Sequence, residues 1–200
     1  MTEIWNTILR KALRCVDEVY PDSEAQNLGE FPIAAFAVEA ATWVARVVPT
    51  HALGKGQDIP LEGFTPNTDG SGTLPLPSDF LRLVSFRMKG WVRAVNSPIR
   101  DTDARYAQQY NKTLRGGEVF PVVALCDGDT KLEYYSSSLG KYAQVADARY
   151  FPMPSEDAEF PENLWDITAW KIAEMVLSSM NDVSSAQLAS AKVTEHLQAL

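Results

Sequence analysis

The middle of the chain contains the segment Leu76-Pro77-Ser78-Asp79-Phe80-Leu81-Arg82-Leu83-Val84-Ser85-Phe86-Arg87-Met88-Lys89-Gly90-Trp91-Val92-Arg93, which has the clearest local pattern of the sequence. Its first residues favour an extended entry, and Ser78 or Asp79 is suited to cap a single helical turn. Residues 84–89 then alternate between apolar and polar side chains, which is typical of a strand with one buried face. Gly90 allows a tight turn, and residues 91–95 resume the alternation. The segment therefore predicts a β-hairpin.

The two ends of the chain have helical periodicity. From Thr2 to Tyr20 apolar residues recur every three or four positions, and an alanine-rich helix is expected from Pro32 to about Val48. After Pro161 another helical stripe begins, Asn181-Asp182 interrupts it, and Ser184 or Ser185 is expected to cap a last helix. We expect residues 1–50 and 161–200 to form one helical bundle, from which residues 51–160 project as a β-rich insertion.

The insertion is predicted to contain several strands and one short helix. Residues 121–126 and 131–137 are expected to pair around the turn Asp127-Gly128-Asp129-Thr130, and residues 142–151 to form another strand. Apolar residues occur on both faces of the first of these strands, so the sheet should be covered on two sides. A helix is expected from Asp101 or Thr102 to about Lys112. The fold class is therefore α+β, with a sandwich or small barrel-like insertion.

The stretch from Pro49 to Thr73 is rich in glycine, proline and short polar residues, and it is predicted to be mostly loop. Ile59, Leu61 and Phe64 offer a short strand-like patch within it. Irregular stretches of this length are uncommon in compact domains unless they serve a function or contact a partner. The stretch is therefore an indication of assembly.

Composition and charge exclude some classes of function. Two hundred residues with 46% hydrophobic content can bury a sizeable core. The net charge of −8 and the pI of about 4.8 disfavour a surface that holds nucleic acid through its phosphates. The same sign suits the wall of a channel through which DNA must slide, because like charges repel the phosphate backbone.

Cysteine usage and hydropathy bear on the compartment. Only Cys15 and Cys126 are present, so no dense disulfide framework is expected and a reducing compartment is the simpler assumption. The N-terminus has no basic region followed by an apolar core, and export is not expected. The most apolar segment, residues 31–48, carries Glu39 and Arg46, which indicates a buried helix and not a membrane span.

The residues that carry chemistry in enzymes and metal sites are not arranged in recognisable patterns. His51 and His196 stand at no zinc-binding spacing from either cysteine. Asp127-Gly128-Asp129 is similar to the start of a calcium loop, but Lys131 and Leu132 follow where oxygen ligands are needed, which favours a hairpin turn. Phosphate-binding glycine loops and the nucleophile elbow of hydrolases do not occur. We predict no catalytic, cofactor-binding or metal-binding residues, and no enzymatic activity.

The opening segment resembles a known family when it is taken together with Tyr106, Gln109, Tyr110, Asn111, Arg115, Gly116 and Pro121. That family is the head-to-tail connector or adaptor proteins of short-tailed and crAss-like bacteriophages, also called ring or tail tubular proteins. In it, a Leu-Pro-x-Asp-Phe-Leu-Arg-Leu run and a Gly-Trp turn lie in a small β-domain attached to a helical bundle. The resemblance covers residues 74–137, and its motif residues here are Pro77, Asp79, Phe80, Leu81, Arg82, Leu83, Gly90, Trp91 and Arg93.

The resemblance implies a structural virion protein, a portal-tail adaptor that joins the phage head to the tail. Such a protein forms a cyclic ring, and the resemblance implies that the ring is a dodecamer. The ring contacts the portal protein and downstream tail or ring proteins. DNA passes through the ring without sequence-specific binding, and no membrane or cofactor takes part. The protein would be assembled in the host cytoplasm and reside in the neck or tail of the virion. The helical bundle is expected to form the ring wall, and the loop from Pro49 to Thr73 and the β-rich part are expected to reach neighbouring copies. The candidate interface residues are Arg87, Tyr106, Tyr110 and Arg115.

A second function is compatible with the residues. Aromatic side chains concentrate in the β-rich part, and most of them are expected to be core. Some could instead form a platform for a carbohydrate or another small ligand, which would make the chain a soluble binding module. Tyr134 and Tyr135 are the residues on which this alternative depends.

Overall fold

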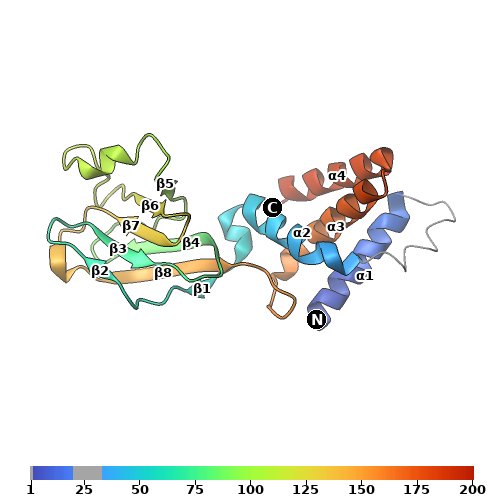
Figure 1. Cartoon of the computed structure of the whole chain (residues 1–200), viewed down its shortest axis with the longest axis horizontal. Coiled ribbons are helices and arrows are strands. Elements are labelled where there is room, and N and C mark those ends of the chain that lie inside the picture. Colours follow the sequence, from blue (N-terminus) through green and yellow to red (C-terminus); the bar gives the residue numbers. More distant parts are fainter. Residues whose placement is uncertain (1, 20–32) are drawn as a thin grey trace. The chain divides into compact units, whose positions relative to one another are not determined.

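The computed structural model describes residues 2–19 and 33–200, which form two compact units (Figure 1). Of the described residues, 2–19, 33–54 and 153–200 belong to the helical unit, and 55–152 form the β-unit. The β-unit is therefore an insertion between two parts of the helical unit, and the fold is α+β. The β-unit, residues 55–152, is somewhat shorter than the predicted insertion of residues 51–160. The expected helix end at Tyr20 and helix start at Pro32 lie outside the described residues.

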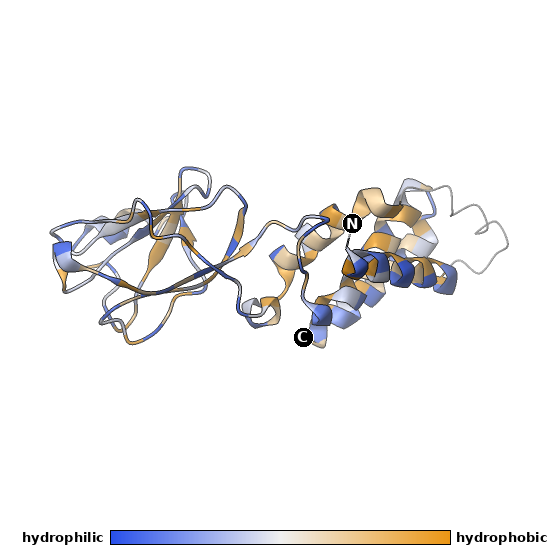
Figure 2. Ribbon diagram, turned by 90° about the horizontal axis from the view of Figure 1, so that it is seen from below, coloured by the Kyte–Doolittle hydropathy of each residue, from blue (hydrophilic) through white to orange (hydrophobic). Residues whose placement is uncertain are grey.

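The helical unit contains α1 (Glu3–Val19), α2 (Ile33–Val47), α3 (Trp165–Ser179) and α4 (Val183–Gln198). These helices occur where periodicity predicts them. Each buries a stripe of residues, and hydrophobic and hydrophilic positions are interleaved along them (Figure 2). Helix α3 packs against all three others and is buried on more than one side, from Ile167 to Leu177. It is the centre of this unit.

The start of α4 differs from the expectation. Asp182, and not Ser184 or Ser185, is the N-cap, and its Oδ1 accepts a hydrogen bond of 3.1 Å from the backbone N–H of Ser185. Asn181 has a φ of 60°, so the chain reverses just before this cap. Asparagine tolerates that left-handed conformation, which leaves the aspartate in the capping position.

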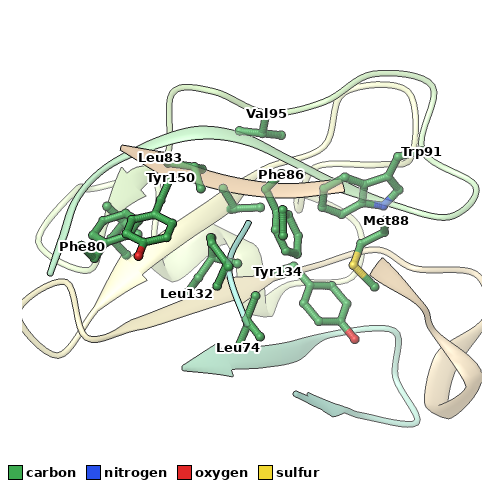
Figure 3. Close-up of a cluster of buried hydrophobic side chains, with 14 of the residues drawn as sticks. Leu74, Phe80, Leu83, Phe86, Met88, Trp91, Val95, Leu132, Tyr134 and Tyr150 are labelled. Atoms are coloured by element: carbon green, nitrogen blue, oxygen red, sulfur yellow. The ribbon is translucent and has the colours of Figure 1, made fainter. Parts of the chain in front are cut away.

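The β-unit consists of two sheets. One has three strands in the order β1-β8-β4, formed by Gln57–Asp58, Val145–Pro152 and Phe80–Met88. The other has five strands in the order β2-β3-β7-β6-β5, formed by Thr65–Pro66, Gly72–Pro75, Lys131–Tyr134, Val123–Cys126 and Ile99–Arg100. The two sheets share a core in which Phe86, Trp91 and Tyr134 lie close together (Figure 3).

The predicted β6–β7 hairpin and the strand β8 are confirmed. Strands β6 and β7 pair antiparallel around residues 127–130, in which Asp127, Gly128 and Asp129 adopt positive φ. Covering of β6 on both faces is confirmed too. Val123 and Leu125 enter the main core, while Ala124 and Cys126 belong to a second cluster with Ile99 and Tyr135.

The hairpin predicted for the opening segment is wrong in its pairing. Strand β4 pairs along most of its length with β8, whereas residues 91–95 meet it only at the bridge between Phe86 and Val95. Strand β8 buries Ala148, Tyr150 and Phe151 beside β4, and residues 92–94 have no comparable apolar set. The distant partner therefore forms the longer ladder.

Irregularities in the β4–β8 register also change which residues of β4 are buried. The pairing shifts between Phe80 and Arg82, between Leu83 and Ser85, and between Arg87 and Met88. Because a bulge changes the face on which later side chains lie, the buried set is Phe80, Leu83, Phe86 and Met88 and not a strict alternation.

The two helical segments predicted within the β-unit are also corrected. Residues 77–80 form a turn closed by a 3.0 Å hydrogen bond from Phe80 N–H to the Pro77 carbonyl. The helix expected from residue 101 to 112 is a series of turns with a 3₁₀ helix at Ala107–Tyr110. The Asp103 side chain accepts the backbone N–H of Arg105 at 2.8 Å, and such local bonds compete with α-helix formation.

The stretch from Pro49 to Thr73 holds more regular structure than expected. It contains a 3₁₀ helix, Thr50–Leu53, as well as β1, β2 and the start of β3. Across residues 2–19 and 33–200, no helix has both the length and the apolar character needed to cross a lipid bilayer.

Candidate functional site

The first half of the motif supports the core of the β-unit. Asp79 Oδ1 accepts a 3.0 Å hydrogen bond from the Tyr150 hydroxyl, and the Phe80 ring stacks on Tyr150 with 5.9 Å between centroids. Leu83 is fully buried, whereas Pro77, Leu81 and Arg82 are partly buried. Desolvation lowers the pKa of the Arg82 guanidinium. Asp79 and Phe80 thus link the start of β4 to β8 through Tyr150.

The second half of the motif brings side chains to the surface. Gly90 has a φ of 94°, which permits the turn that follows β4. Trp91 is buried against Phe86, and its Nε1–H donates to the Ser136 carbonyl at 3.4 Å. The next two residues, Val92 and Arg93, are exposed on the outside of the β-unit.

Val92 and Arg93 join a second loop in one exposed surface. Val92 N–H donates to the Glu118 carbonyl at 3.0 Å, and Arg93 Nε–H donates to the Val119 carbonyl at 2.8 Å. The Arg93 guanidinium lies over the Phe120 ring, 4.1 Å from its centroid. Val92, Val119 and Phe120 are 69%, 53% and 68% exposed. We call Val92, Arg93, Val119 and Phe120 the Phe120 surface.

The chemistry of the Phe120 surface is that of binding. It offers an aromatic ring, two branched aliphatic side chains and a cation held in place by a backbone carbonyl. Exposed apolar side chains gathered in one place are typical of interaction sites, and aromatic residues and arginine contribute most to many protein interfaces. The Phe120 surface therefore fits a macromolecular contact.

A polar cluster fastens the loop of residues 101–115 to the five-stranded sheet. Glu133 Oε2 accepts hydrogen bonds from the hydroxyls of Tyr106 at 2.9 Å, Tyr135 at 2.9 Å and Tyr110 at 3.1 Å. Burial alone raises the pKa of Glu133, but the hydrogen bonds from these tyrosines and from Lys131 lower it by more, so the pKa lies below its usual value. We call these residues the tyrosine–Glu133 cluster, and its role is to hold the loop.

The four candidate interface residues lie in different environments. Tyr106 is partly buried in the tyrosine–Glu133 cluster, and Arg115 Nη2–H donates to the Asp69 carbonyl at 2.8 Å. Tyr110 belongs to the same cluster but leaves much of its ring exposed, and Arg87 is exposed on β4. The structure does not bring these four residues together into one surface.

The tyrosines of the alternative function are not at the surface. Tyr134 is 0% exposed and Tyr135 is 2% exposed. Tyr134 packs against Phe64, Phe86 and Trp91 in the main core. Neither ring is available as a platform for a carbohydrate.

Residues considered for metal or nucleophilic chemistry are dispersed. Asp129 forms an ion pair with Arg100 at 2.7 Å, and Asp127 forms one with Lys131 at 3.0 Å. Both carboxylates thus connect the β6–β7 turn to neighbouring strands. Burial, with Glu18 and Asp166 nearby, raises the pKa of the Cys15 thiol to about 12. No group of three or more histidine, cysteine, aspartate or glutamate side chains in the described part of the chain could hold a metal ion.

Sequence reasoning missed Val92, Val119 and Phe120. The last two follow Gly116-Gly117 and precede Pro121, in a segment with no strand or helix period. Large apolar residues in a short segment between glycine and proline do not belong to a helix or strand that would bury them. This pattern was the available signal for an exposed apolar surface. No model of a known protein family matches the chain, and no curated protein matches it.

Proposed function

We propose that this chain is a structural adaptor of a phage virion that forms a ring between the portal and the tail. In this role it joins head to tail, surrounds the path of the DNA and binds neighbouring copies of itself, the portal protein and downstream tail proteins. It acts without catalysis.

The observation that carries the proposal is the exposed surface that the end of the motif forms with the loop of Val119 and Phe120. The Gly90-Trp91 turn buries its tryptophan and presents Val92 and Arg93 beside Val119 and Phe120. Exposed apolar side chains gathered beside a cation are typical of interaction sites, and a chain that assembles needs such a surface.

The division of the chain into two units also supports the proposal. The helical unit is built from both ends of the chain, and the β-unit is inserted in it. This organisation agrees with the arrangement that the motif resemblance implies, in which a small β-domain is attached to a helical bundle. The net charge of −8 is compatible with a conduit that must not retain DNA.

The proposal is tested by assembly with a portal. The full chain would be purified, mixed with the portal protein of the same genome and examined by native mass spectrometry and negative-stain electron microscopy. We expect rings of the chain docked coaxially on portal rings. A chain that stays monomeric with and without portal, and that is missing from portal-tail particles, would refute the proposal.

A further inference from the structure

We propose that the Phe120 surface of one copy docks in a groove on the opposite edge of the three-stranded sheet of the next copy. The inference rests on the proposed ring-forming function and names the contact between subunits. The groove has a volume of about 290 Å³ and is lined by Asp58, Ile59, Leu61, Val145, Asp147 and Ala148. We call it the Asp58 groove.

The Phe120 surface and the Asp58 groove belong to opposite edges of one rigid sheet. Ile59 N–H donates to the Ala148 carbonyl at 2.9 Å, Ala148 pairs with Phe86, and Phe86 bridges to Val95. This row runs across β8 and β4, with the groove at one end and the segment that carries Val92 and Arg93 at the other. The row ends at Val95, in the same segment as Val92 and Arg93.

Different surfaces at opposite edges make a head-to-tail contact. Such a heterologous contact leaves one free groove and one free Phe120 surface after every addition, so assembly continues until the rotation between neighbours closes a ring. A pair of identical surfaces would instead stop at a dimer. The placement of the two surfaces thus allows many copies to join, in a ring if the rotation between neighbours closes and in an open filament if it does not.

Charges of the two surfaces are complementary. Asp147 is already engaged, because it accepts from Ser85 and pairs with Arg149 at 2.7 Å. Asp58 is exposed and forms no ion pair with another described residue, and the same holds for Arg93. The cation beside Phe120 and the carboxylate at the rim of the groove are both open to a partner. We assign them to each other across the contact.

The lining of the groove is mixed in polarity. Ile59, Leu61, Val145 and Ala148 are apolar, and Leu61 at its edge is about half exposed. Asp58 and Asp147 add two carboxylates. In the described residues, the buried polar side-chain atoms without a hydrogen-bond partner belong to Thr2, Tyr134 and Ser137, none of which lines the groove. A phenyl ring with an adjacent cation matches this lining.

The first experiment removes the aromatic side chain of Phe120. It measures assembly of the full chain by sedimentation velocity and native mass spectrometry over a concentration series. Phe120→Ala is expected to raise the concentration at half-assembly about tenfold or more, as for other truncated interface aromatics. Tyr142→Ala is the matched control, because Tyr142 is 71% exposed and also stacks with a cation, Lys141. It should leave assembly unchanged, and circular dichroism should show both variants folded.

The second experiment exchanges the charges. Arg93→Glu alone and Asp58→Arg alone are each expected to impair assembly, because each sets like charges against each other. An equimolar mixture of the two variants, or both substitutions in one chain, is expected to restore assembly, since opposite charges again meet at every contact. Lys141→Glu controls for the change in net charge that Arg93→Glu causes, since both replace an exposed cation with a carboxylate.

The outcomes separate this inference from the proposed function. If the native chain forms rings and Phe120→Ala and the charge exchange leave them unchanged, the contact is wrong while the adaptor function stands. If the charge exchange behaves as expected but the assemblies are open filaments that never bind portal, the contact is right and the adaptor function is wrong. A native chain that never associates refutes both.

Discussion

The same substitution at two phenylalanines, one buried and one exposed, tests the account of the β-unit most directly. Phe86 is fully buried between Trp91 and Tyr134, with centroid distances of 5.9 and 6.1 Å, whereas Phe120 is 68% exposed. Burying a phenylalanine removes about 200 Å² from water, which at about 25 cal/mol per Å² is worth about 5 kcal/mol. Because residual compaction of the unfolded chain reduces this value, we expect Phe86→Ala to cost about 4 kcal/mol.

The expected cost of Phe120→Ala is smaller, because only about a third of the residue's surface is covered. The same coefficient then gives about 1.5 kcal/mol, including part of the contact with Arg93. For a unit of this size, with an m-value of about 2 kcal/mol per molar urea, Phe86→Ala should lower the unfolding midpoint by about 2 M and Phe120→Ala by less than about 1 M.

The assay must observe the β-unit by itself. Trp91 is the one tryptophan of residues 55–152, and the other four tryptophans belong to the helical unit, so fluorescence would mix the two unfolding transitions. Urea titration with pulsed hydrogen exchange and mass spectrometry follows peptides of each unit separately. Equal midpoint shifts for the two variants, or a larger shift for Phe120→Ala, would refute the assignment of Phe86 to the core and Phe120 to the surface.

Three further predictions concern single contacts. Asp182→Ala removes the cap that accepts the Ser185 N–H and should destabilise the helical unit by about 1 kcal/mol in a thermal or urea melt, with little effect on the β-unit. Gly72→Ala should destabilise the β-unit by about 2 kcal/mol or more, because a Cβ there would lie 2.4 Å from the Tyr134 hydroxyl; an unchanged urea midpoint would contradict this packing. The pKa of Glu133 is lowered in the folded chain from its usual 4.5, so its contribution to stability is complete above pH 4.5 and is lost as the pH falls through the folded-state pKa. The difference in unfolding free energy between the native chain and Glu133→Gln should therefore shrink in urea titrations below pH 4.5, and a difference that stays constant with pH would count against the tyrosine–Glu133 cluster.

Local sequence was sufficient for the elements that depend on near neighbours. The helices α1 to α4 follow from apolar spacing, since a stripe of side chains such as Trp5, Ile8 and Ala12 forms one face only in a helix. The β6–β7 hairpin follows from its turn, in which Asp127, Gly128 and Asp129 tolerate positive φ at low cost. In these elements the residues that interact are a few positions apart, so their pattern is visible in the sequence.

Local sequence misled where a distant segment competed with a near one. The Gly90-Trp91 step predicted a hairpin, yet β4 pairs with β8, more than fifty residues further along the chain. The near segment lacks the apolar residues to cover β4, and the bulges in the β4–β8 ladder move Leu83 and Phe86 to the buried face. Neither the partner nor the bulges can be derived from spacing.

The candidate site illustrates the same division. From the sequence alone came the motif, the acidic balance and the expectation that no catalytic set exists. Only the tertiary structure brought Val92 and Arg93 beside Val119 and Phe120, and only it placed Asp58 at the opposite edge of the same sheet. The physical reason is that exposure and adjacency depend on which long-range ladder forms. That outcome is decided by the total apolar surface each pairing buries, a property of the whole unit and not of any one segment.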